Sequence, residues 1–220
     1  MLRFTLAAAI GDGCIGIPPT RPNCFYLSFT HSAEQRDYLA YKLRRVNAEL
    51  GTNGKPSQPR EVLDPRTGKH YVSCQAMVTN SRLRELYHLL YPSGKKTYTS
   101  IALERIGMEG LAVFWMDDGC VVKSKFAKNR GLLATYCSEP ESGLVCDWIN
   151  GLTGVHPAPY EDRGLYRVRI NASEMPRFLT AIRPYVHSSM KHKVTLAFTH
   201  YNTKSKREYE SSLTIRSEER

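Results

Sequence analysis

Apolar residues recur with two different periods along the chain, which predicts a mixture of helices and strands. Leu39, Leu43, Val46 and Leu50 are spaced by three and four residues, as on one face of an α-helix. In Leu165–Ile170 charged and apolar side chains alternate instead, as in a strand with one buried face. Turn-forming residues separate the two kinds of segment. We therefore expect an α+β fold in which antiparallel sheets are backed by helices.

The same patterns, with the turn signals between them, place the individual elements. Helices are expected over residues 2–11, 32–50, 80–90, 109–117, 138–152 and 172–185. Strands are expected over residues 24–30, 60–63, 70–78, 120–125, 131–137, 155–160 and 165–170. Ser32, with Gln35 three residues later, has the pattern of a capping box at the start of the second helix.

An apolar segment followed by Asp-Gly occurs twice. Leu6–Cys14 returns in character as Ala112–Cys120, so that one copy stands near the start of each half of the chain. Similar strands, hairpins and helices are expected after each copy. We therefore predict two pseudosymmetric halves, residues 1–107 and 108–201. The polar, charged residues 202–220 are predicted to be a disordered tail.

The composition narrows the classes of function. The chain has 220 residues, of which 41% are hydrophobic and 24% charged, as in ordinary globular proteins. It has no apolar run of about 18 residues for a membrane span, no signal-peptide pattern and no nucleotide-binding glycine motif. Its six cysteines lack metal-finger spacing. The formal charge of +10 favours a polyanionic partner such as nucleic acid.

The repeated Asp-Gly pairs carry the candidate chemistry. Asp12 and Asp118 each follow an apolar helix, whose C-terminal end disfavours negative charge. If the two helices pack side by side, the two carboxylates meet and repel each other. Divalent cations such as Mg²⁺ would relieve that repulsion, and two of them could activate water for phosphodiester hydrolysis. The alternative is that each Asp-Gly is only a turn dipeptide.

The second copy resembles a known motif. Leu111–Gly119, with the sequence LAVFWMDDG, resembles the LAGLIDADG motif of homing endonucleases, in particular the group with a second motif of the form LAxWFMDDG that is often encoded in group I introns. Thr5–Gly13 is a looser first copy, and the resemblance extends to about residue 201. It implies a monomer in which two motif helices pack together and each half lays a four-stranded, saddle-shaped antiparallel sheet on DNA.

The resemblance also implies roles for individual residues. The metal-binding acids would be Asp12 and Asp118, which share two or three Mg²⁺ or Mn²⁺ ions. The backbone carbonyls of Gly11 and Asp117 would complete the coordination, whereas the Asp117 side chain takes no primary part. Loop lysines that follow each half's second helix would place positive charge beside the scissile phosphates. We favour Lys96 and Lys191 for this role, with Lys95 and Lys193 as alternatives.

Two residues at the start of the second helix, Ser32 and Arg36, match positions that surround the metal site in the family. The second half has Ser138 and Ser142 at the corresponding positions and no arginine. This departure from the family pattern leaves open whether the two DNA strands would be cut equally.

DNA contacts are expected along the hairpins, because a two-stranded ribbon fits the major groove. The candidates are Lys69, His70, Gln75, Lys123, Lys125, Lys128, Arg130, Arg163, Arg167 and Arg169. The alternative is that their alternation only marks the wet side of a half-buried sheet.

These patterns and the resemblance together predict a site-specific, Mg²⁺-dependent endonuclease that makes a double-strand break in a long DNA target. The rival reading is an intron RNA maturase, or another binding protein, that uses the same scaffold without cleaving DNA. We expect a monomer whose partners are duplex DNA and, as a second candidate, its own intron RNA. Expression in an organelle or a prokaryotic cell is expected, with no membrane partner.

Overall fold

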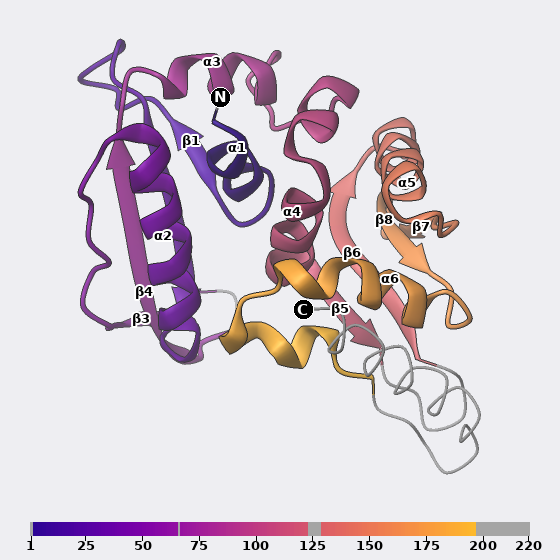
Figure 1. Cartoon of the computed structure of the whole chain (residues 1–220). Coiled ribbons are helices and arrows are strands. Elements are labelled where there is room, and N and C mark those ends of the chain that lie inside the picture. The colour runs from indigo at the N-terminus through magenta and orange to yellow at the C-terminus, as the bar shows by residue number, and fades with distance from the viewer. Residues whose placement is uncertain (1, 66, 123–128, 197–220) are drawn as a thin grey trace.

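Two similar halves flank a central pair of helices in the computed structural model, which describes residues 2–65, 67–122 and 129–196 (Figure 1). Each half contains one four-stranded antiparallel sheet with helices packed against it. The expected α+β architecture with two pseudosymmetric halves is therefore confirmed. No helix within the described residues is long and apolar enough to cross a bilayer.

The two halves follow the same order of elements. The first consists of α1 (Arg3–Ile10), β1 (Cys14–Gly16), β2 (Tyr26–Ser32), η1 (Ala33–Gln35), α2 (Arg36–Leu50), β3 (Arg60–Leu63), β4 (His70–Thr79) and α3 (Leu83–Leu90). The second consists of α4 (Ser100–Asp118), β5 (Gly119–Val122), β6 (Arg130–Cys137), α5 (Glu139–Thr153), β7 (Ala158–Asp162), β8 (Leu165–Ile170), α6 (Met175–Ile182), η2 (Arg183–Tyr185) and η3 (Ser188–Val194). The sheet orders, β1-β2-β4-β3 and β5-β6-β8-β7, correspond strand by strand.

The first and fourth helices form the seam between the halves (Figure 1). Ala7, Ala8 and Ala9 on α1 are almost completely buried, and small side chains allow the two backbones to approach closely. On α4 all residues from Leu111 to Met116 are buried, including Trp115. Residues Phe4–Ile10 of α1 and Gly110–Met116 of α4 are all buried, so the seam is the centre of one continuous core.

The buried N-terminus of α1 is capped from another helix. Glu49 of α2 accepts hydrogen bonds from the backbone N–H groups of Phe4 and Thr5, at 3.0 and 2.8 Å, and from the Thr5 hydroxyl at 2.7 Å. These contacts satisfy N–H groups that lack partners within the helix and place a negative charge at its positive end. They fix the position of α1 along α2.

The structure departs from the expected elements in a few places. The capping box expected at Ser32 does not form, because the short helix η1 intervenes before α2 and the Gln35 side chain pairs with His31. The corresponding box in the second half is present at Ser138 and Glu141. The short strand β1 was not expected. α4 begins at Ser100, well before residue 109, and Gly107 kinks it with a φ of +58°. The expected tail, residues 202–220, lies outside the described residues.

We expect that enlarging a seam residue destabilises the protein. Ala8→Leu inserts a branched side chain where α1 meets α4, and such overpacking costs about 1–3 kcal/mol of unfolding free energy. Urea denaturation measures this change. Ala48→Leu, on the exposed face of α2, is the matched control and should leave stability nearly unchanged. Equal effects of the two substitutions would contradict the close packing of the seam.

Candidate functional site

The two Asp-Gly pairs meet at one end of the seam. The backbone N–H of Asp12 donates to Asp117 Oδ2 at 3.1 Å, across the boundary between the halves. A Cβ atom on Gly11 would lie only 2.1 Å from the same oxygen, so this close approach requires glycine. The repeated motif therefore brings Asp12, Asp117 and Asp118 into one acidic site.

Burial and mutual repulsion disfavour negative charge on the motif acids. The pKa of Asp118 is raised to about 7, first by burial and then by the charges of Asp12 and Asp117. The pKa of Asp12 is also raised, by burial and by Asp117. The carboxylates of this cluster repel one another, and a divalent cation would relieve that repulsion. Carboxylate and backbone oxygens are ligands that Mg²⁺ and Mn²⁺ prefer. The donor set thus fits hard divalent cations.

Each motif acid is bracketed by a lysine from its own half. Lys96 Nζ donates to the carbonyl oxygens of Gly11 and Gly13, at 2.8 and 3.0 Å, on either side of Asp12. Lys193 Nζ donates to Gly119 O at 2.7 Å and reaches Asp117 O at 3.5 Å, on either side of Asp118. The two ammonium groups are therefore equivalent under the pseudosymmetry.

Lys191, the residue favoured from the sequence, is exposed and does not occupy this position. The expectation is corrected to Lys193, which was the alternative. Both lie in η3, a 3₁₀-helix with three residues per turn, so side chains two positions apart point in different directions. The carbonyl oxygens of Gly11 and Asp117, which the resemblance assigns to the metals, accept hydrogen bonds from these lysines.

Asp117 is held by a buried ion pair that the sequence analysis missed. Lys42 Nζ of α2 lies 2.7 Å from Asp117 Oδ2, and both side chains are completely buried. The Tyr38 hydroxyl donates to the other oxygen at 2.9 Å. One signal was available in the sequence, because Lys42 falls within the apolar stripe of Leu39, Leu43 and Val46.

A buried histidine completes this side of the site. His31 Nδ1 lies 3.1 Å from Gln35 Oε1 and 3.7 Å from Asp12 Oδ2, and Nε2 lies 3.4 Å from Lys42 Nζ. Burial and the neighbouring Lys42 lower the pKa of His31, which favours the neutral imidazole. One ligand atom from each of Asp12, His31 and Asp117 lies within 4.8 Å of the other two.

The two residues expected to surround the metals lie elsewhere. Ser32 and Arg36 are exposed, whereas the residues one position earlier, His31 and Gln35, face the acids. The expectation is displaced by one residue because β2 extends to Ser32 before the chain turns into η1. In the second half Ser138 caps α5, and the buried Ser142 donates to Arg167 O at 3.2 Å.

The predicted DNA-contacting residues that the structure describes lie in or beside the sheet strands, some exposed and some half-buried. Val168 and Ile170 of β8 are buried under the helices, which leaves Arg167 and Arg169 on the opposite, helix-free face. Arg167 forms an ion pair with Asp162 and stacks 4.5 Å from the Tyr136 ring. Residues with exposed side chains on or beside the hairpins include Lys69, His70, Arg130 and Arg163.

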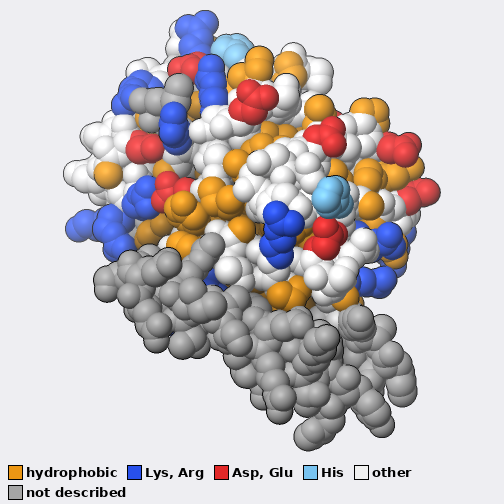
Figure 2. Space-filling model, turned by 45° about the vertical axis from the view of Figure 1, so that its right-hand side comes forward, with side chains coloured by type: hydrophobic (Ala, Val, Ile, Leu, Met, Phe, Trp, Pro, Cys, Tyr) orange, Lys and Arg blue, Asp and Glu red, His pale blue; other side chains and the backbone are white. Residues whose placement is uncertain are grey.

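Other members of that set are partly engaged or lie outside the described residues. Gln75 is half-buried and accepts from Arg60 Nη2 at 3.4 Å, and His70 lies 3.0 Å from Glu61. Lys123, Lys125 and Lys128 fall outside the described residues. The face in Figure 2 mixes basic, acidic and apolar side chains, so basic residues do not gather on that side.

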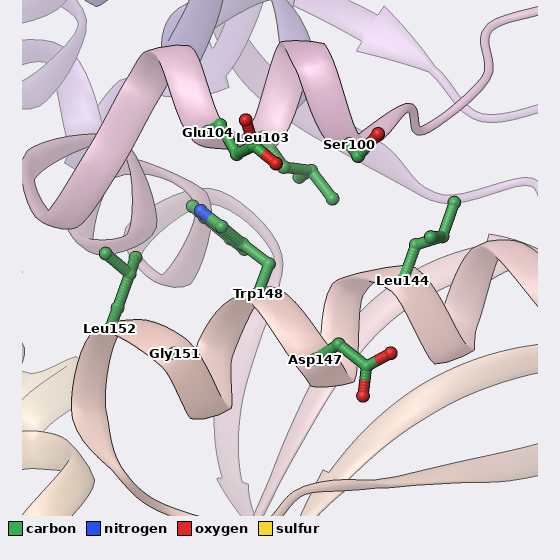
Figure 3. A pocket seen from close by; sticks show the side chains of 8 residues that line it. All are labelled: Ser100, Leu103, Glu104, Leu144, Asp147, Trp148, Gly151 and Leu152. Atoms are coloured by element: carbon green, nitrogen blue, oxygen red, sulfur yellow. The ribbon is translucent and has the colours of Figure 1, made fainter.

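One groove, of about 410 Å³, lies apart from the acidic site, between the N-terminal part of α4 and α5 (Figure 3). Its lining is largely apolar, with Leu103 and Trp148 on opposite sides and the carboxylates of Glu104 and Asp147 at the rim. None of the motif acids or their lysines lines it.

Comparisons with known proteins bear on the family and the fold of the chain. A family model described as the LAGLIDADG DNA endonuclease family matches residues 9–178. The homing endonuclease I-WcaI bound to its DNA recognition sequence has a TM-score of 0.76 at 16% identity, over 90% of this chain and 86% of that one. This likeness shows a common fold.

Two further solved structures are more distant. The LAGLIDADG meganuclease I-AabMI bound to uncleaved DNA has a TM-score of 0.49 at 14% identity, over 88% of this chain and 87% of that one. Full-length DUF199/WhiA from Thermatoga maritima has a TM-score of 0.48 at 13% identity, over 98% of this chain and 68% of that one. No curated protein sequence matches the chain.

Breaking the buried pair from either side should be costly. Lys42→Met and Asp117→Asn each leave one uncompensated buried charge or an unfilled set of hydrogen bonds, with an expected loss of about 3–5 kcal/mol of unfolding free energy. The double variant Lys42→Met/Asp117→Asn removes both charges at nearly constant volume and should recover most of the loss. Urea denaturation of the four proteins forms the double-mutant cycle. Additive losses would show that the two side chains are not coupled.

The raised pKa of Asp118 predicts a stability that falls with pH in the metal-free protein. The folded state holds this proton more tightly than the unfolded chain, so its stabilising effect is present below about pH 4 and is lost as pH rises through 7. The full loss is about 4 kcal/mol for a shift of this size, of which about 3 kcal/mol falls between pH 5 and pH 8. Asp118→Asn should lack this component, as measured by urea denaturation in EDTA at pH 5 and pH 8. An unchanged pH dependence in the variant would contradict the assignment.

Proposed function

This chain belongs to the LAGLIDADG DNA endonuclease family, and from that premise we propose that it is a homing endonuclease that hydrolyses both strands of a long duplex DNA target. The observation that carries the proposal is the meeting of Asp12 and Asp118 at the end of the seam, each with a lysine beside it. A turn dipeptide needs neither the partner carboxylate nor the lysine.

The site residues divide the work of hydrolysis between them. Asp12 and Asp118 would hold Mg²⁺ or Mn²⁺. When bound, such cations supply a water of lowered pKa and stabilise the leaving oxygen of a phosphodiester. Lys96 and Lys193 place a positive charge beside each motif acid, where it can stabilise the charge that develops on a scissile phosphate. One chain supplies both acids, which supports activity as a monomer.

The helix-free faces of the two sheets are suited to duplex DNA. The homing endonuclease I-WcaI, which shares the fold, has a solved structure in which it is bound to its DNA recognition sequence. Here Arg167 is held in place by Asp162 and Tyr136 before any DNA binds, so little conformational freedom is lost on contact. Antiparallel ribbons fit the major groove, where arginine can bind guanine through two hydrogen bonds. The net charge of +10 supports binding to the phosphate backbone.

We expect the protein to cleave members of a random duplex library in Mg²⁺, and the selected duplex then serves as substrate. Asp118→Asn should lower the cleavage rate by about 10²–10³-fold, because it removes a charged cation ligand. End-labelled strands separated on a gel measure the rate of each cut, with EDTA as the blank. If no duplex is cut and the intron transcript binds tightly, the maturase reading replaces the nuclease.

The two lysines of η3 provide a matched pair for the second half. Lys193→Met removes the ammonium beside Asp118 and should lower cleavage by about 10²-fold. Lys191→Met, two residues away on the same short helix, changes the net charge equally and should leave the rate close to wild type. The measurement is cleavage of the selected duplex at saturating protein. Equal losses would mean that general charge, rather than the position of Lys193, matters.

A further inference from the structure

A lysine ammonium occupies a place that is lined with metal ligands. The ligand atoms of Asp12, His31 and Asp117 lie within 4.8 Å of one another. Lys42 Nζ lies 2.7 Å from Asp117 Oδ2 and 3.4 Å from His31 Nε2. Two carboxylates and a neutral imidazole form a set that binds borderline transition metals well. Lys42 thus places a cation of the protein itself against two of these three side chains, Asp117 and His31.

The ammonium has no route to leave its place. The Lys42 side chain is completely buried, and Nζ lies 5.2 Å from the Phe29 ring centre and 5.4 Å from the Tyr38 ring centre. The π faces of both aromatic rings attract a cation. The ammonium is therefore shielded from exchange with solvent cations, whereas Asp12 is exposed and Asp118 is half-buried.

The pseudosymmetric positions that correspond to Lys42 and Asp117 do not carry a second ion pair. Gly51 ends α2 and Gly154 ends α5 with the same left-handed cap, so Lys42 corresponds to Val145, which is also buried. Asp117 and Gly11 correspond in the same way, since each directly precedes its motif acid. The ion pair therefore has no counterpart at these positions, and the absence of a side chain at Gly11 leaves the room that Asp117 occupies.

We propose that Lys42 is a built-in cation that fills the Asp12–His31–Asp117 ligand set and keeps a transition metal out of it. Asp117 is then a positioning residue that holds Asp12 and α2 in place, and exchangeable cations bind through Asp12 and Asp118 alone. This inference rests on the proposed function only in treating those two acids as cation ligands. By this proposal, Lys42 makes the site selective for hard ions with oxygen ligands over ions that prefer imidazole ligands.

The test replaces the ammonium by an uncharged side chain of similar length and asks whether a metal takes its place. The full chain, without DNA, is titrated with Co²⁺, whose visible absorption reports imidazole and carboxylate ligation. Lys42→Met should bind one Co²⁺ more than wild type, at least about tenfold tighter than any wild-type site that shows the same band. The exposed thiols of Cys14 and Cys120 are present in every variant and cancel in the difference.

Two further variants identify the ligands. Lys42→Met/Asp117→Asn and Lys42→Met/His31→Gln should each lose the added Co²⁺ band, because each lacks one ligand of the set. A Lys42→Met protein that is folded and gains no Co²⁺ would overturn the proposal. So would a wild-type protein that already binds Co²⁺ through His31, with a band that His31→Gln removes.

If Lys42→Met does not fold without a cation, the proposal makes a different prediction. Co²⁺ should restore a cooperative unfolding transition to Lys42→Met, because an ion that binds only the folded state stabilises it, whereas Mg²⁺ at the same concentration should not. Failure of Co²⁺ to do so, while Lys42→Met/Asp117→Asn folds, would also overturn the proposal. None of these measurements involves DNA cleavage, so a failure of the nuclease function would leave their outcome intact.

Discussion

Three carboxylates meet at the end of an apolar seam, and most of the site can be understood as the response to that concentration of charge. Close packing of α1 on α4 brings Asp12, Asp117 and Asp118 together. Negative charge that is buried without partners is very unfavourable. Ammonium groups from three segments therefore surround the acids. Lys42 of α2 binds the Asp117 carboxylate. Lys96, from the loop after α3, and Lys193 of η3 donate to the carbonyl oxygens that flank Asp12 and Asp118.

These contacts also explain why the halves stay in register. The Asp117 side chain comes from the second half and is bound by Lys42, Tyr38 and the Asp12 backbone of the first. A buried ion pair of this kind adds little net stability, because desolvation offsets the attraction. It does impose a single geometry, since each donor must find its acceptor. The scaffold is repeated in the two halves, but the polar interior of the site is not.

Much of the fold and the central acids could be predicted from the sequence because both depend on local patterns. The alternation in Leu165–Ile170 and the repeated Asp-Gly are visible in short windows. Lys193 was only an alternative to Lys191 and His31 was not predicted, since an offset of two residues in η3 or of one residue in β2 decides which side chain faces inward. Lys42 was overlooked because a lysine is normally assigned to solvent. Its counter-charge, Asp117, lies in the other half of the chain.

The burial that makes the site suited to cations also destabilises the charged acids of the metal-free protein. Desolvation is the largest cause of the raised pKa of both Asp12 and Asp118, so the fold itself, more than any neighbour, opposes their charge. Free energy that the core provides along the seam is thus partly offset at its end. A divalent ion can recover that cost where an ammonium is not already present. Lys42 supplies such a cation directly to the Asp117 carboxylate, whereas Lys96 and Lys193 donate to the backbone carbonyls that flank Asp12 and Asp118.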